Sequence, residues 1–194
     1  MSMINYIKAS YKKCTQIKGQ TGFMCDIYIH DGDGIRYVLG ESGDRPLIAF
    51  GINPSTATGE KSDHTISRIK SYAVKYGFDG FKMLNIYPAR AKDPDDLPEV
   101  IDSDIHSANL EAIKQAIDGG SGILCAWGEL VLKRNYLTDC MNDIAEIIIK
   151  SKIPTYCLGL TKTGHPYHAS VRRKTPDELL RFDVESYLKN AIGQ

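Results

Sequence analysis

Residues 46–56 read Pro-Leu-Ile-Ala-Phe-Gly-Ile-Asn-Pro-Ser-Thr, and this stretch decides both the fold and the expected place of the chemistry. Its first five residues form an apolar run typical of a buried parallel strand. Gly51 permits a close turn, and Asn53 is held in an extended or turn geometry because a proline follows it. Ser55 and Thr56 add hydroxyl groups at the carboxyl end of the strand, where ligands bind in open α/β sheets. An ordinary strand-to-loop turn is the alternative interpretation.

Strands and helices alternate along the rest of the chain. Buried-type strands are expected at 81–87, 122–127 and 153–158. Helices are expected after an N-cap at Asp63 or Ser62, at 103–117, at about 130–149 and from the capping box Thr175-Pro176-Asp177-Glu178 to about Leu188. The Asp-Gly-Asp-Gly turn at 31–34 predicts a β-hairpin within residues 23–39. This alternation predicts an α/β three-layer sandwich with a central, mostly parallel sheet of about four strands, plus the amino-terminal hairpin.

Composition narrows the class of protein. A chain of 194 residues fits a single domain, 1–194, with residues 1–20 as a loosely packed lead-in. A formal net charge of zero argues against a strongly electrostatic nucleic-acid binder, although a local basic patch stays open. Five scattered cysteines fit a reducing cytoplasm better than a disulfide framework. The sequence shows neither a signal-type apolar segment nor a run long enough to span a bilayer, so we expect a cytoplasmic protein without a membrane partner.

Polar residues follow each expected core strand although strand packing does not require them. The second strand carries Asn85, with Tyr87 and Arg90 just beyond that residue, and the third gives Trp127. The fourth is followed by Lys162, His165, His168, Ser170, Arg172 and Arg173. The carboxyl ends of parallel strands meet on one rim of a sheet, so Asn53, Asn85 and His165 can surround one ligand.

Each of these residues also has a purely structural interpretation. Asn53 could bond the following turn, Asn85 could tie down neighbouring loops, and His165 could be a surface loop residue. Trp127 is of a type that often packs in a core, and the Arg-Arg-Lys run at 172–174 could be a solvated cationic edge.

Three common kinds of site are excluded by motif. His165 and His168 stand near no cysteine pair and no His-Glu-x-x-His helix, so no metal site is expected. Neither Ser55 nor Ser170 lies in a Gly-x-Ser-x-Gly elbow. The Gly-rich phosphate loops of nucleotide cofactor sites are absent, so no cofactor is expected. The remaining pocket of amides and histidine, with cations at its edge, suits a neutral heterocycle attached to a phosphate.

The motifs resemble two known families. Residues 51–57, 63–68, 84–94, 104–109, 126–128 and 158–166 together resemble the family called domain of unknown function 1643. More distantly, Gly-Ile-Asn-Pro-Ser at 51–55 and His-Pro-Tyr-His-Ala-Ser at 165–170 look like the first and second motifs of the uracil-DNA glycosylase superfamily. Leu84-Asn85 and Ala126-Trp127-Gly128 resemble strand ends of the same superfamily, in the same order along the chain.

The second resemblance implies roles for individual residues. Asn53 would orient a water or polarise the attacked sugar carbon, Asn85 would bind the base edge, and His165 would stabilise charge on the departing base. Tyr87 or Phe50 would stack on the base. Phosphates would be held near Ser55 and Ser170 by backbone N–H groups, with help from Lys162, Arg172 and Arg173. The leucine that wedges into a duplex has no counterpart, which leaves nucleotides, modified bases and single strands as targets.

The sequence therefore predicts a protein acting on the N-glycosidic bond of a nucleobase in a nucleotide or nucleic acid. A non-catalytic nucleotide-binding module and an unrelated small-molecule hydrolase are the alternatives. The expected partner is a nucleobase, nucleotide or single strand. Asn53 and His165 are the candidate catalytic residues, and the candidate substrate-binding residues are Phe50, Gly51, Ser55, Thr56, Asn85, Tyr87, Arg90, Trp127, Lys162, His168, Ser170, Arg172 and Arg173.

Overall fold

The structure is a computed structural model that describes residues 5, 25–32, 34–171 and 175–192. The expected lead-in at 1–20, apart from Asn5, lies outside the described residues, as do Arg172 and Arg173. The described chain forms one seven-stranded sheet in the order β1-β2-β4-β3-β5-β6-β7. Its strands are β1 (Ile27–Asp31), β2 (Ile35–Glu41), β3 (Pro46–Gly51), β4 (Gly80–Asn85), β5 (Gly122–Cys125), β6 (Thr155–Cys157) and β7 (Leu180–Arg181).

The α/β class is confirmed, but the sheet is mixed and larger than the expected one of about four strands. β4, β3, β5 and β6 pair in parallel. The predicted hairpin forms, and its second strand joins the same sheet by antiparallel pairing with β4. At the other end, β7 pairs antiparallel with β6. These extra strands cover edges that a four-stranded sheet would leave with unpaired backbone groups.

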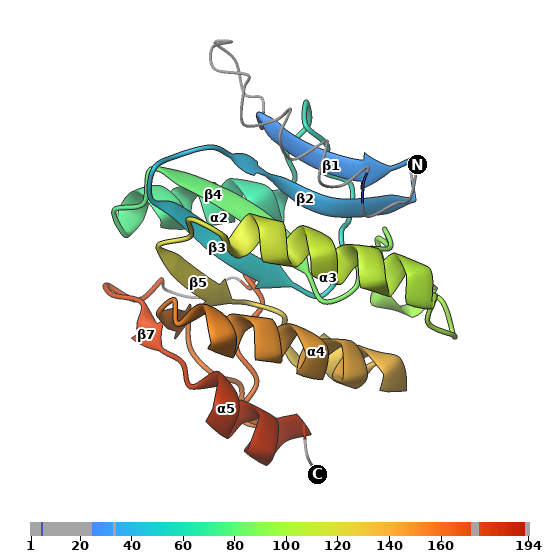
Figure 1. The fold of residues 1–194 in the computed structure, drawn as a ribbon. Coiled ribbons are helices and arrows are strands. Elements are labelled where there is room, and N and C mark those ends of the chain that lie inside the picture. Colours follow the sequence, from blue (N-terminus) through green and yellow to red (C-terminus); the bar gives the residue numbers. More distant parts are fainter. Residues whose placement is uncertain (1–4, 6–24, 33, 172–174, 193–194) are drawn as a thin grey trace.

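Helices cover both faces of the sheet. The helices are α2 (His64–Lys75), α3 (Ser103–Ile117), α4 (Asn135–Ser151) and α5 (Val184–Tyr187), with 3₁₀ turns at Pro94–Asp96 and Glu129–Leu132 and a π turn at Leu188–Ile192. Figure 1 shows α3 and α4 on one face and α2 on the opposite face. Asp63 caps α2 by accepting a hydrogen bond from the Ile66 backbone N–H (2.9 Å), so of the two cap candidates, Asp63 and Ser62, it is Asp63 that takes this role. None of the helices in the described part of the chain is both long enough and apolar enough for a membrane span.

The predicted helix from Thr175 is wrong in its first half. Residues 175–179 are not helical, β7 follows them, and the last helix begins only after Asp183. The carbonyl oxygen of Pro176 accepts hydrogen bonds from Lys75 Nζ and Tyr76 Oη, both at 2.7 Å. These contacts with the end of α2 outweigh the local capping pattern.

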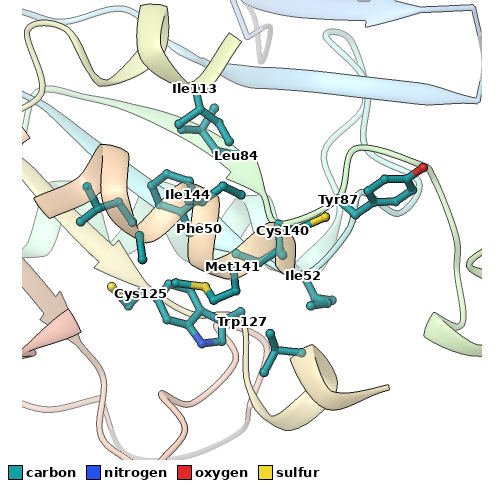
Figure 2. Close-up of a cluster of buried hydrophobic side chains, with 14 of the residues drawn as sticks. Phe50, Ile52, Leu84, Tyr87, Ile113, Cys125, Trp127, Cys140, Met141 and Ile144 are labelled. Atoms are coloured by element: carbon teal, nitrogen blue, oxygen red, sulfur yellow. The ribbon is translucent and has the colours of Figure 1, made fainter. Parts of the chain in front are cut away.

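Two apolar cores lie on the two faces of the sheet. The larger core packs β3, β4 and β5 against α3 and α4, and Figure 2 shows Phe50, Tyr87 and Trp127 among its side chains. The smaller core lies under α2 and includes Ile66 and Met83. Three of the predicted ligand-binding aromatic residues therefore have packing roles.

The strand order places a topological switch point between β3 and β5. From β3 the chain passes through α2 on one face, and from β5 it passes through α4 on the other. The loops that follow these two neighbouring strands therefore leave the sheet in opposite directions. A crevice opens at such a point, and it is where open α/β sheets bind ligands.

Candidate active site

A cavity of about 270 Å³ lies at the carboxyl ends of the parallel strands, on the α2 face of the sheet. Its volume is just below the ~300–1,000 Å³ of typical small-molecule sites. The lining residues come from seven separate parts of the chain: Arg36, Ile52, Asn53, Ser55, Asp63, Thr65, Ile66, Met83, Ala91, Lys92, Leu130, His168 and Ser170. The structure thus brings together Asn53, Ser55, His168 and Ser170 of the predicted site.

The Asn85 side chain lies next to this cavity and has no hydrogen-bond partner in the part of the chain that the structure describes. The residue is fully buried, and neither Nδ2 nor Oδ1 is paired among the described residues. Gly51 lies against both Asn85 and Met83. A Cβ atom added to this glycine would stand 3.3 Å from Asn85 Oδ1 and 2.6 Å from Met83 Cε, so these two side chains lie close together. Met83 lines the cavity, so the amide lies immediately beside its wall. Buried polar groups are almost always paired, and the unpaired amide therefore calls for a functional explanation.

A second buried asparagine shows what a structural amide does in this fold. Asn109 on α3 is also fully buried, and its Nδ2 donates to the carbonyl oxygens of Asn85 (3.0 Å) and Ile86 (3.4 Å). These bonds fasten the end of β4 to α3. The Asn85 backbone is thus held in place by another residue, while its own side chain holds nothing in the described structure.

Asn53 combines a structural and a site role. Its Nδ2 donates to the carbonyl oxygens of Pro54 (3.0 Å) and Ala91 (2.9 Å), so it joins the loops that follow β3 and β4. This leaves the acceptor Oδ1 for a ligand or water in the cavity that Asn53 lines.

His168 contributes a hydrogen-bond donor to the cavity. Its Nδ1 accepts a hydrogen bond from the Ser170 backbone N–H (3.3 Å) and lies 2.7 Å from Ser170 Oγ. Burial lowers the pKa of His168, and the nearby Asp63 carboxylate opposes that shift. A neutral imidazole whose Nδ1 is an acceptor carries its proton on Nε2. His168 can therefore donate a hydrogen bond from Nε2.

His165 lies against a different cavity. That cavity, of about 650 Å³, is lined by Lys162 and His165 together with residues from the start of α4. Trp127 Nε1 donates to Tyr187 Oη (3.0 Å), which leaves the phenol proton for His165 Nδ1 at 2.9 Å. Burial lowers the pKa of His165, with the Glu129 carboxylate opposing the shift. His165 and Asn53 therefore line different cavities, and His165 has a partner in the core.

Arg90 holds the loop around the site without lining the cavity. Its Nη1 donates to the Ser55 carbonyl oxygen (2.6 Å), and its Nη2 donates to Tyr28 Oη (2.8 Å) and the Ala57 carbonyl oxygen (3.0 Å). Thr56 is exposed and does not line the cavity either.

The sequence pattern does not single out Arg36 as a site residue, and it marks Asp63 only as a candidate helix cap. Arg36 lines the cavity, is 2% exposed, and donates from Nη1 to the Ala57 carbonyl oxygen (3.1 Å). The available signal was a charged residue inside the apolar run 35–39. Its direction could not be read from the sequence, because a β-bulge in the hairpin sets it.

A family model described as "Protein of unknown function (DUF1643)" matches residues 36–169. The chain belongs to this family. No curated protein and no solved structure matches the chain. The matched segment of this DUF1643 member begins at Arg36 and ends one residue after His168, and it contains all the cavity-lining residues except Ser170. The match covers the arrangement just described, and the family description assigns no activity to it.

The cavity offers the groups that hydrolysis of a polar ring compound requires. Asp63 supplies a carboxylate, His168 an N–H donor, Asn53 an amide oxygen, and Arg36 and Lys92 positive charge. In the part of the chain that the structure describes, no three His, Cys, Asp or Glu residues are grouped closely enough to hold a metal ion.

Proposed function

We propose that this DUF1643 member binds a nucleobase in the cavity beside Asn85 and hydrolyses the N-glycosidic bond that joins the base to its sugar. The unpaired, fully buried amide of Asn85 carries the proposal. An amide presents one donor and one acceptor side by side, which matches the edge of a nucleobase. Met83 is flexible at its terminal methyl, so a ring entering the cavity reaches the amide when that methyl moves.

The remaining roles are assigned by position in the cavity. His168 Nε2–H stabilises the negative charge that develops on the departing base, the role that the glycosylase resemblance gave to His165. Asp63 uses Oδ1 to cap α2, and its other oxygen is available to accept a proton from water. Asn53 Oδ1 orients that water. The water oxygen bonds to the sugar carbon as the carbon–nitrogen bond breaks, and one water proton passes to Asp63. The base leaves as an anion hydrogen-bonded to His168 Nε2–H and takes up a proton from solvent, while Asp63 releases to solvent the proton that it accepted.

A binding module without catalysis is the second candidate. It is favoured by the position of His165, which is held by Tyr187 away from the cavity. Under this alternative, the Asn85 amide would bind the base and no bond would break. Both candidates fit a reducing cytoplasm, because the described cysteines (Cys25, Cys125, Cys140 and Cys157) are all free thiols.

The test is release of free base from a panel of nucleosides, 5′-nucleotides and short single strands, followed by chromatography. Asp63→Asn is expected to lower the rate by about 10²–10⁴-fold, the usual contribution of a positioned proton-transfer group. His168→Gln is expected to lower it by about 10²–10³-fold, the usual cost of losing one donor that stabilises developing charge. Asparagine is as good a helix cap as aspartate, so Asp63→Asn should remain folded.

Leu132→Ser provides the matched control. Leu132 is exposed and lines only the second cavity, so this variant should keep the wild-type rate. Saturable binding of a nucleotide without any released base would instead favour the binding module. If no member of the panel binds or reacts, the proposed function is wrong.

A further inference from the structure

Arg36 is a buried cation that the described residues do not hold in an ion pair, and Asp63 is the carboxylate that acts on its charge. Its side chain is 2% exposed, yet it forms no ion pair with any carboxylate among the described residues. The bond from Nη1 to the Ala57 carbonyl oxygen is its one hydrogen bond there, and Nε has no partner. Buried charges in proteins are normally paired, because removing an ion from water is costly.

A second arginine increases the positive charge at the same place. Arg90 Nη2 donates to the Ala57 carbonyl oxygen at 3.0 Å, and Arg36 Nη1 donates to the same atom at 3.1 Å. The two guanidinium groups therefore lie close together. Burial and the Arg90 charge lower the pKa of Arg36 to about 10, with Asp63 opposing the shift, so Arg36 remains charged at neutral pH.

The backbone directs Arg36 into the cavity. Val38 pairs with Ile29 while Arg36 pairs with His30, so Tyr37 is an extra residue in β2. Regular alternation would place Arg36 on the same face as Val38, which packs in the α3 and α4 core. The bulge turns Arg36 to the α2 face instead, where it lines the cavity. Bulges of this kind often reorient side chains next to active sites.

The side chains that line the cavity carry more positive than negative charge, which a bound anion would neutralise. Arg36 and Lys92 are the lining cations and Asp63 is the lining carboxylate, while Arg90 does not line the cavity and shares the Ala57 carbonyl oxygen with Arg36. The planar guanidinium fork of arginine matches the oxygens of a phosphate group. A phosphate at Arg36 and a base at Asn85 are the two ends of a nucleotide.

We propose that Arg36 binds the terminal phosphate of a mononucleotide, which makes a nucleoside monophosphate the substrate class of the proposed function on which this inference rests. A phosphodiester inside a strand needs an exit for the chain on both sides. Arg36 is almost completely buried, so the cavity that it lines suits a terminal phosphate better than a chain-internal one.

The test is calorimetric binding at pH 7.5 of a nucleoside, its 5′-monophosphate and inorganic phosphate to the wild-type chain, Arg36→Gln and Arg36→Lys. The wild-type chain is expected to bind the monophosphate about 10- to 100-fold more tightly than the nucleoside, as one charge-assisted contact would give. Arg36→Gln should lose this preference but keep its affinity for the nucleoside. Arg36→Lys should keep part of the preference, which controls for misfolding.

The outcomes separate this inference from the proposed function. Nucleoside binding with no preference for the monophosphate overturns the role of Arg36 and leaves the base site intact. Phosphate binding that depends on Arg36, without any nucleoside or nucleotide binding, supports an anion site but overturns the nucleotide assignment. A 5′-phosphorylated single strand that binds as tightly as the mononucleotide overturns the mononucleotide class.

Discussion

Asn85→Leu should make the free protein more stable while it removes ligand binding. The wild-type residue buries two unpaired polar atoms, Nδ2 and Oδ1, and each such atom costs about 1–3 kcal/mol. Leucine has a similar size and no polar atoms, so the substitution should raise the free energy of unfolding by at least about 2 kcal/mol. For a chain of this length, that corresponds to a rise of about 4–8 °C in Tm.

Urea unfolding followed by fluorescence measures this change, because the chain has a single tryptophan, Trp127, which is fully buried. Asn109→Leu is the comparison variant, since Asn109 is equally buried and its Oδ1 is also unpaired among the described residues, but its Nδ2 fastens the end of β4. It should lose about 1–3 kcal/mol of stability. If Asn85→Leu destabilises the protein as much as Asn109→Leu does, the Asn85 amide has a structural role and the reasoning is refuted.

Two further predictions concern the rest of the fold. Tyr187→Phe should lower stability by about 1–3 kcal/mol because Trp127 Nε1 and His165 Nδ1 lose their partner. Nucleotide binding measured by calorimetry should stay unchanged. A loss of binding would indicate that His165 belongs to the binding site. Burial lowers the pKa of Lys82 to about 8 from 10.5, so the unfolded state binds more protons between these values and stability should rise with pH there relative to Lys82→Met. Equal urea midpoints for wild type and Lys82→Met across pH 8–10.5 would contradict this.

Local signals predicted most of the elements because short-range chemistry controls them. The Asp-Gly turn gave the hairpin, and Asp63 gave the start of α2. The apolar run at 46–50 gave β3 at the centre of the parallel strands. These features depend on the few residues around them, so one sequence is enough to read them.

Features that depend on contacts between distant parts of the chain could not be predicted from the sequence. The capping box at Thr175 competes with hydrogen bonds from the end of α2, and no sequence pattern reports those bonds. The choice between two histidines three residues apart depends on how the loop after β6 turns, and the structure brings His168, not His165, to the cavity of Asn53. The bulge at Tyr37, which directs Arg36, is a property of strand pairing.

The most direct test of the central claim is a crystal structure of the protein with the nucleoside monophosphate that binds most tightly. The account predicts the base edge about 3 Å from both Nδ2 and Oδ1 of Asn85, in the range of ordinary hydrogen bonds. It also predicts the Met83 methyl displaced from its place over Gly51. A nucleotide bound in the His165 cavity, with water paired to the Asn85 amide, would contradict it.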